Sequence, residues 1–346
     1  MQDLALLEGL LQRYSPSRLE NAACAYLVSA MAELGFTASK DAAGNALGVK
    51  GTGPGEIMLL GHIDTVPGII DVRQEGDWLY GRGAVDAKGP LACFTAAAAR
   101  LTPPPGWRIT VAGAVGEESQ SHGALYLRER HRPFMLIIGE PSKWDHITLG
   151  FKGSLWLDYN VQVSMAHTAS GIQSAPEVAV HFWNELCAWC AALNPPGSGP
   201  FNQLTPTLRG MHSSSNGFIE SAHLRIGLRL PPAVGSETAI AKLHELCSEH
   251  GKLKIEDPIP AYRAEKNTPL VRAFLAAIRG QGGTPVFSLK TGTSDMNLVA
   301  PSWGCPSVAY GPGDSTLDHT PGERISIAEY QKSIDVLTRV LTQLMA

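Results

Sequence analysis

The chain has 346 residues, of which 44% are hydrophobic and 17% charged, a composition typical of an ordered globular protein rather than a disordered or fibrous one. Its formal net charge of −4 gives no basic excess that would indicate nucleic acid binding, and its apolar runs are shorter than the roughly 20 residues that span a bilayer. Its cysteines are too few and too scattered for a disulfide framework, and its N-terminal residues lack the pattern of a secretory signal, so we expect a cytoplasmic protein.

The first predicted element is a helix over residues 17–34. Ser17 and Glu20 have the spacing of a capping box, apolar residues recur every three or four positions, and Gly35 marks the end. Apolar runs that predict buried strands follow at 46–51, 56–64, 107–115 and 134–140. The Ala-rich segment 89–101 predicts a helix among them. Strands that alternate with helices indicate an α/β sheet.

The pattern changes over residues 153–262. Here the sequence predicts a strand at 154–164, a helix at 176–193, a Pro/Gly turn at 194–200, a strand at 221–232 and a helix at 236–251. This order is typical of a compact two-layer α+β domain. The α/β pattern then returns at 268–280, 285–295, 305–313 and 326–345. We therefore predict one catalytic domain built from residues 1–152 and 263–346, which carries an inserted domain at 153–262.

Side chains that bind divalent metals occur beside apolar runs or glycine turns. Histidine and carboxylate ligands suit hard or borderline divalent metals, and they occur in "LLGHIDTVPG", "GRGAVDAKGP", "AVGEESQS", "IIGEPS" and "STLDHTPGE". Any single one could be a polar strand end, but their joint occurrence indicates a metal site. His62 and Asp64 would share one face of a strand, so Asp64 could hold the imidazole of His62 in the correct tautomer.

Two adjacent carboxylates, Glu117 and Glu118, follow the apolar run at 107–115 without a basic residue beside them. An isolated pair of this kind is usually a solvated edge. If the run continues as a strand, the two side chains point to opposite faces and have different roles. Spacing alone leaves open which carboxylate has which role.

The ordered motifs "GHIDTVPG", "GRGAVDAKGP", "GEES", "GEPS" and "DHTPGE" resemble those of the di-zinc deacylases and carboxypeptidases. This family includes acetylornithine deacetylase, succinyl-diaminopimelate desuccinylase, aminoacylase and carboxypeptidase G, and the resemblance covers essentially the whole chain. It implies an α/β fold with a phosphorylase/hydrolase-like mixed-sheet catalytic domain and an inserted two-layer α+β lid or dimerisation domain. It also implies a homodimer.

The resemblance implies two Zn²⁺ ions as cofactors, with Co²⁺ as a substitute. His62 and Glu140 would complete one metal site and Glu118 and His319 the other, while Asp86 would bridge the two and precede a cis peptide bond. Glu117 would be the general base, with Asp64 and His167 as further catalytic residues. In the family, the histidine that "SMAHTAS" matches often reaches the active site from the partner subunit.

Substrate contacts are implied for Asn216, Arg229, Gly292 and Thr293. The segment "NGFIESAHLRIGLRLPP" resembles the family's Asn-to-Arg pattern, and "KTGTSDMN" resembles its substrate loop. Gly227 departs from relatives that often carry aspartate, which weakens this mapping. Taken without the resemblance, His167 is a surface residue and Arg229 caps a sheet.

The implied reaction is hydrolysis of linear amides in N-acyl amino acids. The chain most resembles the short members of lysine and arginine biosynthesis, which release lysine or ornithine from an acidic amino-group carrier protein. Residues 151–262 contain seven Lys or Arg against nine Asp or Glu, so they show no complementary basic excess. The alternatives are an N-acetyl-ornithine or N-acetyl-lysine deacetylase, a related desuccinylase or carboxypeptidase, and a non-enzymatic metal-binding scaffold.

Overall fold

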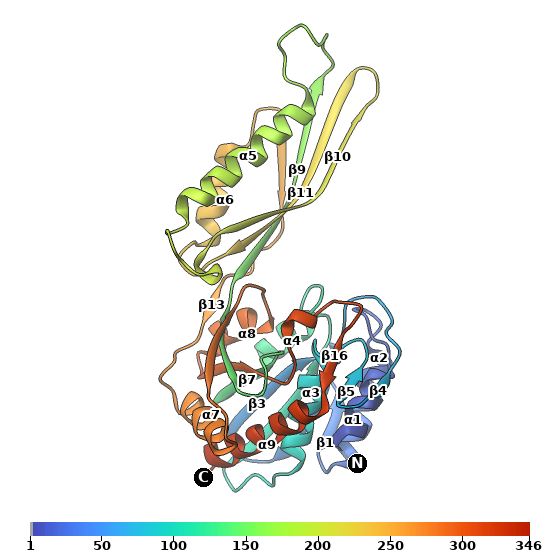
Figure 1. The fold of residues 1–346 in the computed structure, drawn as a ribbon, viewed down its shortest axis with the longest axis vertical. Coiled ribbons are helices and arrows are strands. Elements are labelled where there is room, and N and C mark those ends of the chain that lie inside the picture. The colour runs from blue at the N-terminus through green and yellow to red at the C-terminus, as the bar shows by residue number, and fades with distance from the viewer. Residues whose placement is uncertain (1–2) are drawn as a thin grey trace. The chain divides into compact units, whose positions relative to one another are not determined.

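The computed structural model describes residues 3–346 and divides the chain into two compact units, drawn as ribbons in Figure 1. Unit 1 comprises the chain up to Gly150 together with Ala264–Leu289 and Ser294–Ala346, and unit 2 comprises Phe151–Arg263 with Lys290–Thr293. The expected fold class, an α/β domain that carries an inserted α+β domain, is confirmed. The predicted catalytic domain, residues 1–152 and 263–346, includes residues 290–293, whereas the structure groups them with unit 2.

Unit 1 is built on a mixed sheet with the strand order β1-β2-β6-β3-β7-β15-β8, in which β14 also pairs with β8. Its strands are β1 (Thr37–Lys40), β2 (Ala46–Gly51), β3 (Gly55–His62), β6 (Trp107–Ala114), β7 (Met135–Gly139), β8 (His146–Phe151), β14 (Val286–Lys290) and β15 (Ser307–Tyr310). Strand β3 runs parallel to both β6 and β7, and β7 runs parallel to β15. The carboxyl ends of these four strands therefore lie along one edge of the sheet.

Helices cover this sheet, and they are α1 (Asp3–Leu11), α2 (Asn21–Glu33), α3 (Lys88–Ala99), α4 (His122–Arg130), α7 (Pro269–Gly280), α8 (Asp295–Trp303) and α9 (Ile327–Leu344). Helix α3 packs against β3 and β6 and also against α9, so it is buried over almost its whole length (Figure 1). A small sheet contains β4 (Arg73–Glu75), β5 (Trp78–Tyr80) and β16 (Arg324–Ser326). No helix in the described part of the chain is both long and apolar enough to cross a membrane.

The predicted capping box at Ser17 and Glu20 is wrong. Helix α2 begins at Asn21, and Glu20 precedes it without a capping bond from its side chain. The Ser17 hydroxyl donates instead to Oδ2 of Asp64 at 2.7 Å. A hydrogen bond to the buried Asp64 carboxylate contributes more than a helix cap at the surface, because water can replace the cap but cannot reach the carboxylate.

Unit 2 contains a four-stranded antiparallel sheet in the order β10-β11-β9-β12. Its elements are β9 (Gly153–Ser164), α5 (Ala175–Leu193), the 3₁₀ turn η1 (Pro200–Asn202), β10 (Thr205–Ser215), β11 (Ile219–Leu230), α6 (Ser236–Leu246), β12 (Gly251–Ile255) and β13 (Tyr262–Arg263). Alternate residues of β9 are buried, as expected for a sheet with one solvated face. Tyr159 stacks on Phe182 of α5 with ring centroids 4.0 Å apart, which joins the helix to the sheet.

Candidate metal centre

The predicted metal ligands of unit 1 follow the carboxyl ends of its parallel strands. His62 is the last residue of β3, Glu140 directly follows β7, and Glu118 lies in the turn after β6. The strand register places His62 opposite Ala114 and Gly61 opposite Gly139. Three strand ends therefore meet at one place, as expected for a site at the carboxyl edge of an α/β sheet.

Asp86 lies between two histidines that come from opposite ends of the chain. Its Oδ1 is 3.0 Å from Nε2 of His62, and its Oδ2 is 3.1 Å from Nε2 of His319. Oε1 of Glu118 is 3.0 Å from the same nitrogen of His319. Two ligands of a tetrahedral zinc ion with bonds of about 2.1 Å lie about 3.4 Å apart. The three separations are a few tenths of an ångström shorter, so a small outward movement of these side chains would let each pair share a metal ion.

The candidate ligand atoms form two groups, each compact enough to hold one metal ion. His62, Glu117 and Glu118 make one group, and Asp86, Glu118 and His319 make the other; in each, the ligand atoms lie within 4.8 Å of one another. Hydrogen bonds to Asp86 and Glu118 raise the pKa of His319 to about 10. Binding of a metal ion at this nitrogen would displace its proton.

Buried negative charge provides a second test of this donor set. Burial raises the pKa of Glu117, and the charge of Glu140 adds to this while His62 opposes it. Burial also raises the pKa of Glu140, and the charge of Asp86 adds to it. Carboxylates that resist ionisation together become stable anions when divalent cations lie among them. The residues present therefore fit a pair of divalent ions.

Asp64 connects the histidine to the two glutamates. Nδ1 of His62 donates to the backbone oxygen of Asp64 at 3.0 Å, which leaves Nε2 available as a ligand atom. The Asp64 carboxylate accepts the backbone N–H groups of Glu117 and Glu118 at 3.0 and 3.1 Å. Oδ1 of Asp64 also lies 3.5 Å from Nδ1 of His62, so both the carbonyl and the carboxylate of Asp64 face the imidazole that it is predicted to orient, while the carboxylate also holds the turn of the two glutamates.

The inference that Glu117 and Glu118 point to opposite faces of a strand is wrong. Strand β6 ends at Ala114, so both glutamates lie in the turn that follows it. Gly116 opens this turn with φ +78°, and a Cβ there would lie 2.4 Å from Nδ1 of His122. The turn, rather than strand alternation, allows both carboxylates to approach His62.

Within unit 2 the predicted substrate residues form two separate sets. Nη1 of Arg229 donates to Oγ1 of Thr293 at 3.2 Å, and Gly292 is adjacent to Thr293. Asn216 lies at the turn between β10 and β11, where its Oδ1 accepts the backbone N–H groups of Phe218 and Ile219. Ile219 and Arg229 are ten positions apart on β11, which corresponds to about 33 Å of extended strand.

His167 belongs to the Asn216 end of this sheet. Ser164 pairs with Ile219, and Met165 donates its backbone N–H to the carbonyl of Phe218. His167 is exposed, and its Nδ1 accepts the backbone N–H of Ala169 at 3.1 Å. The proton of the neutral ring is then on Nε2, which makes Nε2 a hydrogen-bond donor.

One buried carboxylate near the centre was not predicted. Asp295 begins α8 and is 3% exposed, and its Oδ1 has no hydrogen-bond partner. Burial raises the pKa of Asp295 to about 7, although a hydrogen bond with Ser121 lowers it. In the sequence, Asp295 follows "GTS" in the predicted substrate loop. An acidic residue at that position is also typical of the first turn of a helix, so the sequence alone does not mark it as part of the site.

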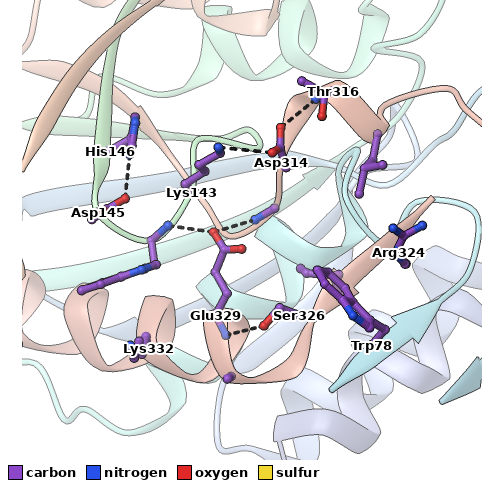
Figure 2. Close-up of a pocket in the computed structure, with 15 residues that line it drawn as sticks. Trp78, Lys143, Asp145, His146, Asp314, Thr316, Arg324, Ser326, Glu329 and Lys332 are labelled. Atoms are coloured by element: carbon purple, nitrogen blue, oxygen red, sulfur yellow. Dashed lines mark hydrogen bonds and ion pairs between the residues drawn. The ribbon is translucent and has the colours of Figure 1, made fainter. Parts of the chain in front are cut away.

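A separate hollow of about 720 Å³ lies in unit 1 and is shown in Figure 2. Its cationic groups already have partners: Lys143 pairs with Asp314 at 3.2 Å, and Nζ of Lys332 lies 4.7 Å from the ring centroid of Trp144. None of the predicted site residues lines it. We therefore assign the chemistry to the cluster around Asp86.

Comparisons with known proteins agree with this geometry. The model of the family described as Peptidase family M20/M25/M40 matches residues 58–343. A LysW-lysine hydrolase from Deinococcus radiodurans is 45% identical, over 94% of this chain and 92% of that protein. A LysW-lysine/LysW-ornithine hydrolase from Saccharolobus islandicus is 32% identical, over 94% and 90%. An M20 family metallo-carboxypeptidase from Sulfolobus solfataricus shares the fold, with a TM-score of 0.80, 18% identity and coverage of 100% and 99%.

Proposed function

The chain belongs to peptidase family M20/M25/M40, and we propose that it is a zinc-dependent amide hydrolase of lysine and arginine biosynthesis. Its proposed substrate is lysine or ornithine joined through an amide to an amino-group carrier protein, and hydrolysis releases the free amino acid. The observation that carries the chemistry is Asp86 lying between His62 and His319 with Glu117 beside them. The observation that carries the substrate is 45% identity to a LysW-lysine hydrolase over nearly the whole chain.

In this proposal His62 and Glu140 would hold one zinc ion, Glu118 and His319 would hold the other, and Asp86 would contribute to both. Bound zinc would supply a water of lowered pKa and polarise the substrate carbonyl. Glu117 accepts the proton of that water on its carboxylate and then delivers it to the nitrogen of the leaving amine. Asp64 keeps Glu117 in place because it holds the backbone of the turn.

We also propose that the active protein is a homodimer in which His167 acts on the partner subunit's site. His167 and Asn216 lie about 33 Å of strand away from Arg229 within one unit 2, too far for one small substrate to contact both sets. Two subunits in opposite orientations could supply one set each. Apolar side chains exposed at the His167 end support an interface there, with Phe218 82% and Met165 45% exposed.

A mixture of two inactive variants tests this arrangement. His167→Ala and Glu117→Gln should each be inactive alone, but mixed dimers would contain one site with Glu117 from one chain and His167 from the other. With random exchange, about a quarter of the wild-type activity should return. Sedimentation analysis with one variant tagged shows whether mixed dimers form. Mixed dimers without recovered activity would place His167 in its own subunit's site, and an active His167→Ala variant on its own would place it outside catalysis.

A comparison of substrates tests the carrier assignment. The rate of amino-acid release should be measured as lysine from carrier-linked lysine and N-acetyl-lysine and as ornithine from N-acetyl-ornithine, with Glu117→Gln as the control for background hydrolysis. We expect kcat/KM for the carrier conjugate to exceed the others by about 100-fold, because binding energy from remote parts of a substrate lowers the barrier at the reacting bond. Comparable values for all three would make the protein a small-molecule deacetylase.

A further inference from the structure

Arg82 and Glu323 form an ion pair that is almost excluded from solvent. Nη1 of Arg82 lies 2.8 Å from Oε2 of Glu323, and the two side chains are 8% and 1% exposed. Neither residue belongs to the proposed metal ligands or to the proton transfers. Both stand close to ligands in the chain, since Arg82 precedes Asp86 by four positions and Glu323 follows His319 by four.

The second oxygen of Glu323 binds the backbone of the proposed bridging residue. Oε1 accepts the backbone N–H of Val85 at 2.9 Å and that of Asp86 at 3.1 Å. The carboxylate therefore fixes the main chain from which the Asp86 side chain extends to His62 and His319. A shift of this main chain would move both of those contacts at once.

Arg82 also binds the loop that follows Asp64. Its Nε donates to the carbonyl oxygen of Gly68 at 3.0 Å, and Gly68 follows Asp64 by four positions. Gly68 has φ +118°, and a Cβ there would lie 3.2 Å from Nη2 of Arg82, so the glycine leaves room for the guanidinium. One ion pair thus joins the loops that carry Asp64, Asp86 and His319.

We infer that Glu323, held by Arg82, is a positioning residue that presets Asp86 between the two histidines and thereby sets the affinity of both metal sites. Partners outside the ligand set commonly tune metal affinity in this way, because they fix a ligand before the ion arrives. The inference rests on the metal centre of the proposed function. If that metal centre does not exist, the wild-type protein will bind no zinc.

Glu329 provides a matched control in the same C-terminal segment. Its Oε1 also accepts two backbone N–H groups, from Trp144 at 3.0 Å and Gly313 at 3.4 Å (Figure 2). Those two residues are not metal ligands in the proposal. Glu323→Gln and Glu329→Gln therefore make the same chemical change at carboxylates with similar backbone partners, and only the first adjoins Asp86.

The experiment measures the zinc dissociation constants of apo wild type, Glu323→Gln and Glu329→Gln by competition with a chromophoric chelator. Denaturant unfolding of each apo protein runs in parallel and reports general loss of stability. We expect Glu323→Gln to weaken zinc binding about 10- to 100-fold, while Glu329→Gln stays within about threefold of wild type. At saturating zinc, KM should be unchanged because the substrate contacts are intact.

Equal zinc affinities in Glu323→Gln and wild type would overturn the inference while leaving the metal centre itself in place. So would equal weakening in Glu323→Gln and Glu329→Gln, because the effect would then follow from general destabilisation. If Glu323→Gln does not fold, Arg82→Lys takes its place. That variant keeps a cation beside Glu323 but loses the bond to Gly68, and wild-type zinc affinity in it would also reject the inference.

Discussion

Replacing Glu117 with glutamine should leave zinc binding intact but lower kcat by about three orders of magnitude, the usual contribution of a well-placed general base. The amide of glutamine has nearly the shape of the carboxylate but cannot accept the proton of the attacking water. The turn itself should persist, because the contact from Asp64 is made to the backbone N–H of Glu117. Single-turnover hydrolysis and metal analysis of the same sample separate the two effects.

Glu118→Gln is the matched control for Glu117→Gln, since it changes the neighbouring side chain in the same turn. Oε1 of Glu118 lies 3.0 Å from Nε2 of His319, so this variant should lose zinc affinity as well as activity. Both glutamates lie within metal-binding distance of His62, and the reverse assignment is therefore the alternative outcome. Zinc loss in Glu117→Gln with retention in Glu118→Gln would exchange the two roles.

The residue types of this proposed centre could be predicted because each residue follows a strand or turn that can be recognised from the adjacent sequence. His62 and Glu140 end apolar runs that form β3 and β7, and parallel strands bring such ends to one edge. The different roles of Glu117 and Glu118 were inferred from strand geometry, which does not apply to a turn. Their approach to His62 depends instead on Gly116 and on Asp64, which is 53 positions away from Glu117.

The contacts that could not be predicted join distant parts of the chain. Ser17 reaches Asp64 across 47 positions, and Arg82 reaches Glu323 across 241. Local periodicity carries no information about such pairs, because each residue alone fits an ordinary cap or surface charge. Strand β10 was missed for a related reason: its residues are mostly exposed or half-buried, so it lacks the apolar alternation that marks a strand.

The proposed bridging role of Asp86 predicts that its removal affects two metal ions, whereas removal of one histidine affects one. Asp86→Ala deletes the oxygens beside both His62 and His319, while His319→Ala leaves the contact between His62 and Asp86 unchanged. Wild type should bind two zinc ions per chain, His319→Ala about one and Asp86→Ala nearly none. Elemental analysis after dialysis against a zinc buffer measures these ratios, and activity should be lost in both variants.

His146→Ala is the control for simply deleting an imidazole from unit 1. Nδ1 of His146 pairs with Oδ1 of Asp145 at 2.6 Å in the hollow of Figure 2, so the variant removes a histidine–carboxylate contact of the same kind without touching a proposed ligand. It should keep two zinc ions. Asp86→Ala that also keeps both would show that the two sites are assembled independently, and the bridge would have to be abandoned. Loss of only one ion in Asp86→Ala would instead assign Asp86 to a single site, because removal of a shared carboxylate affects both ions.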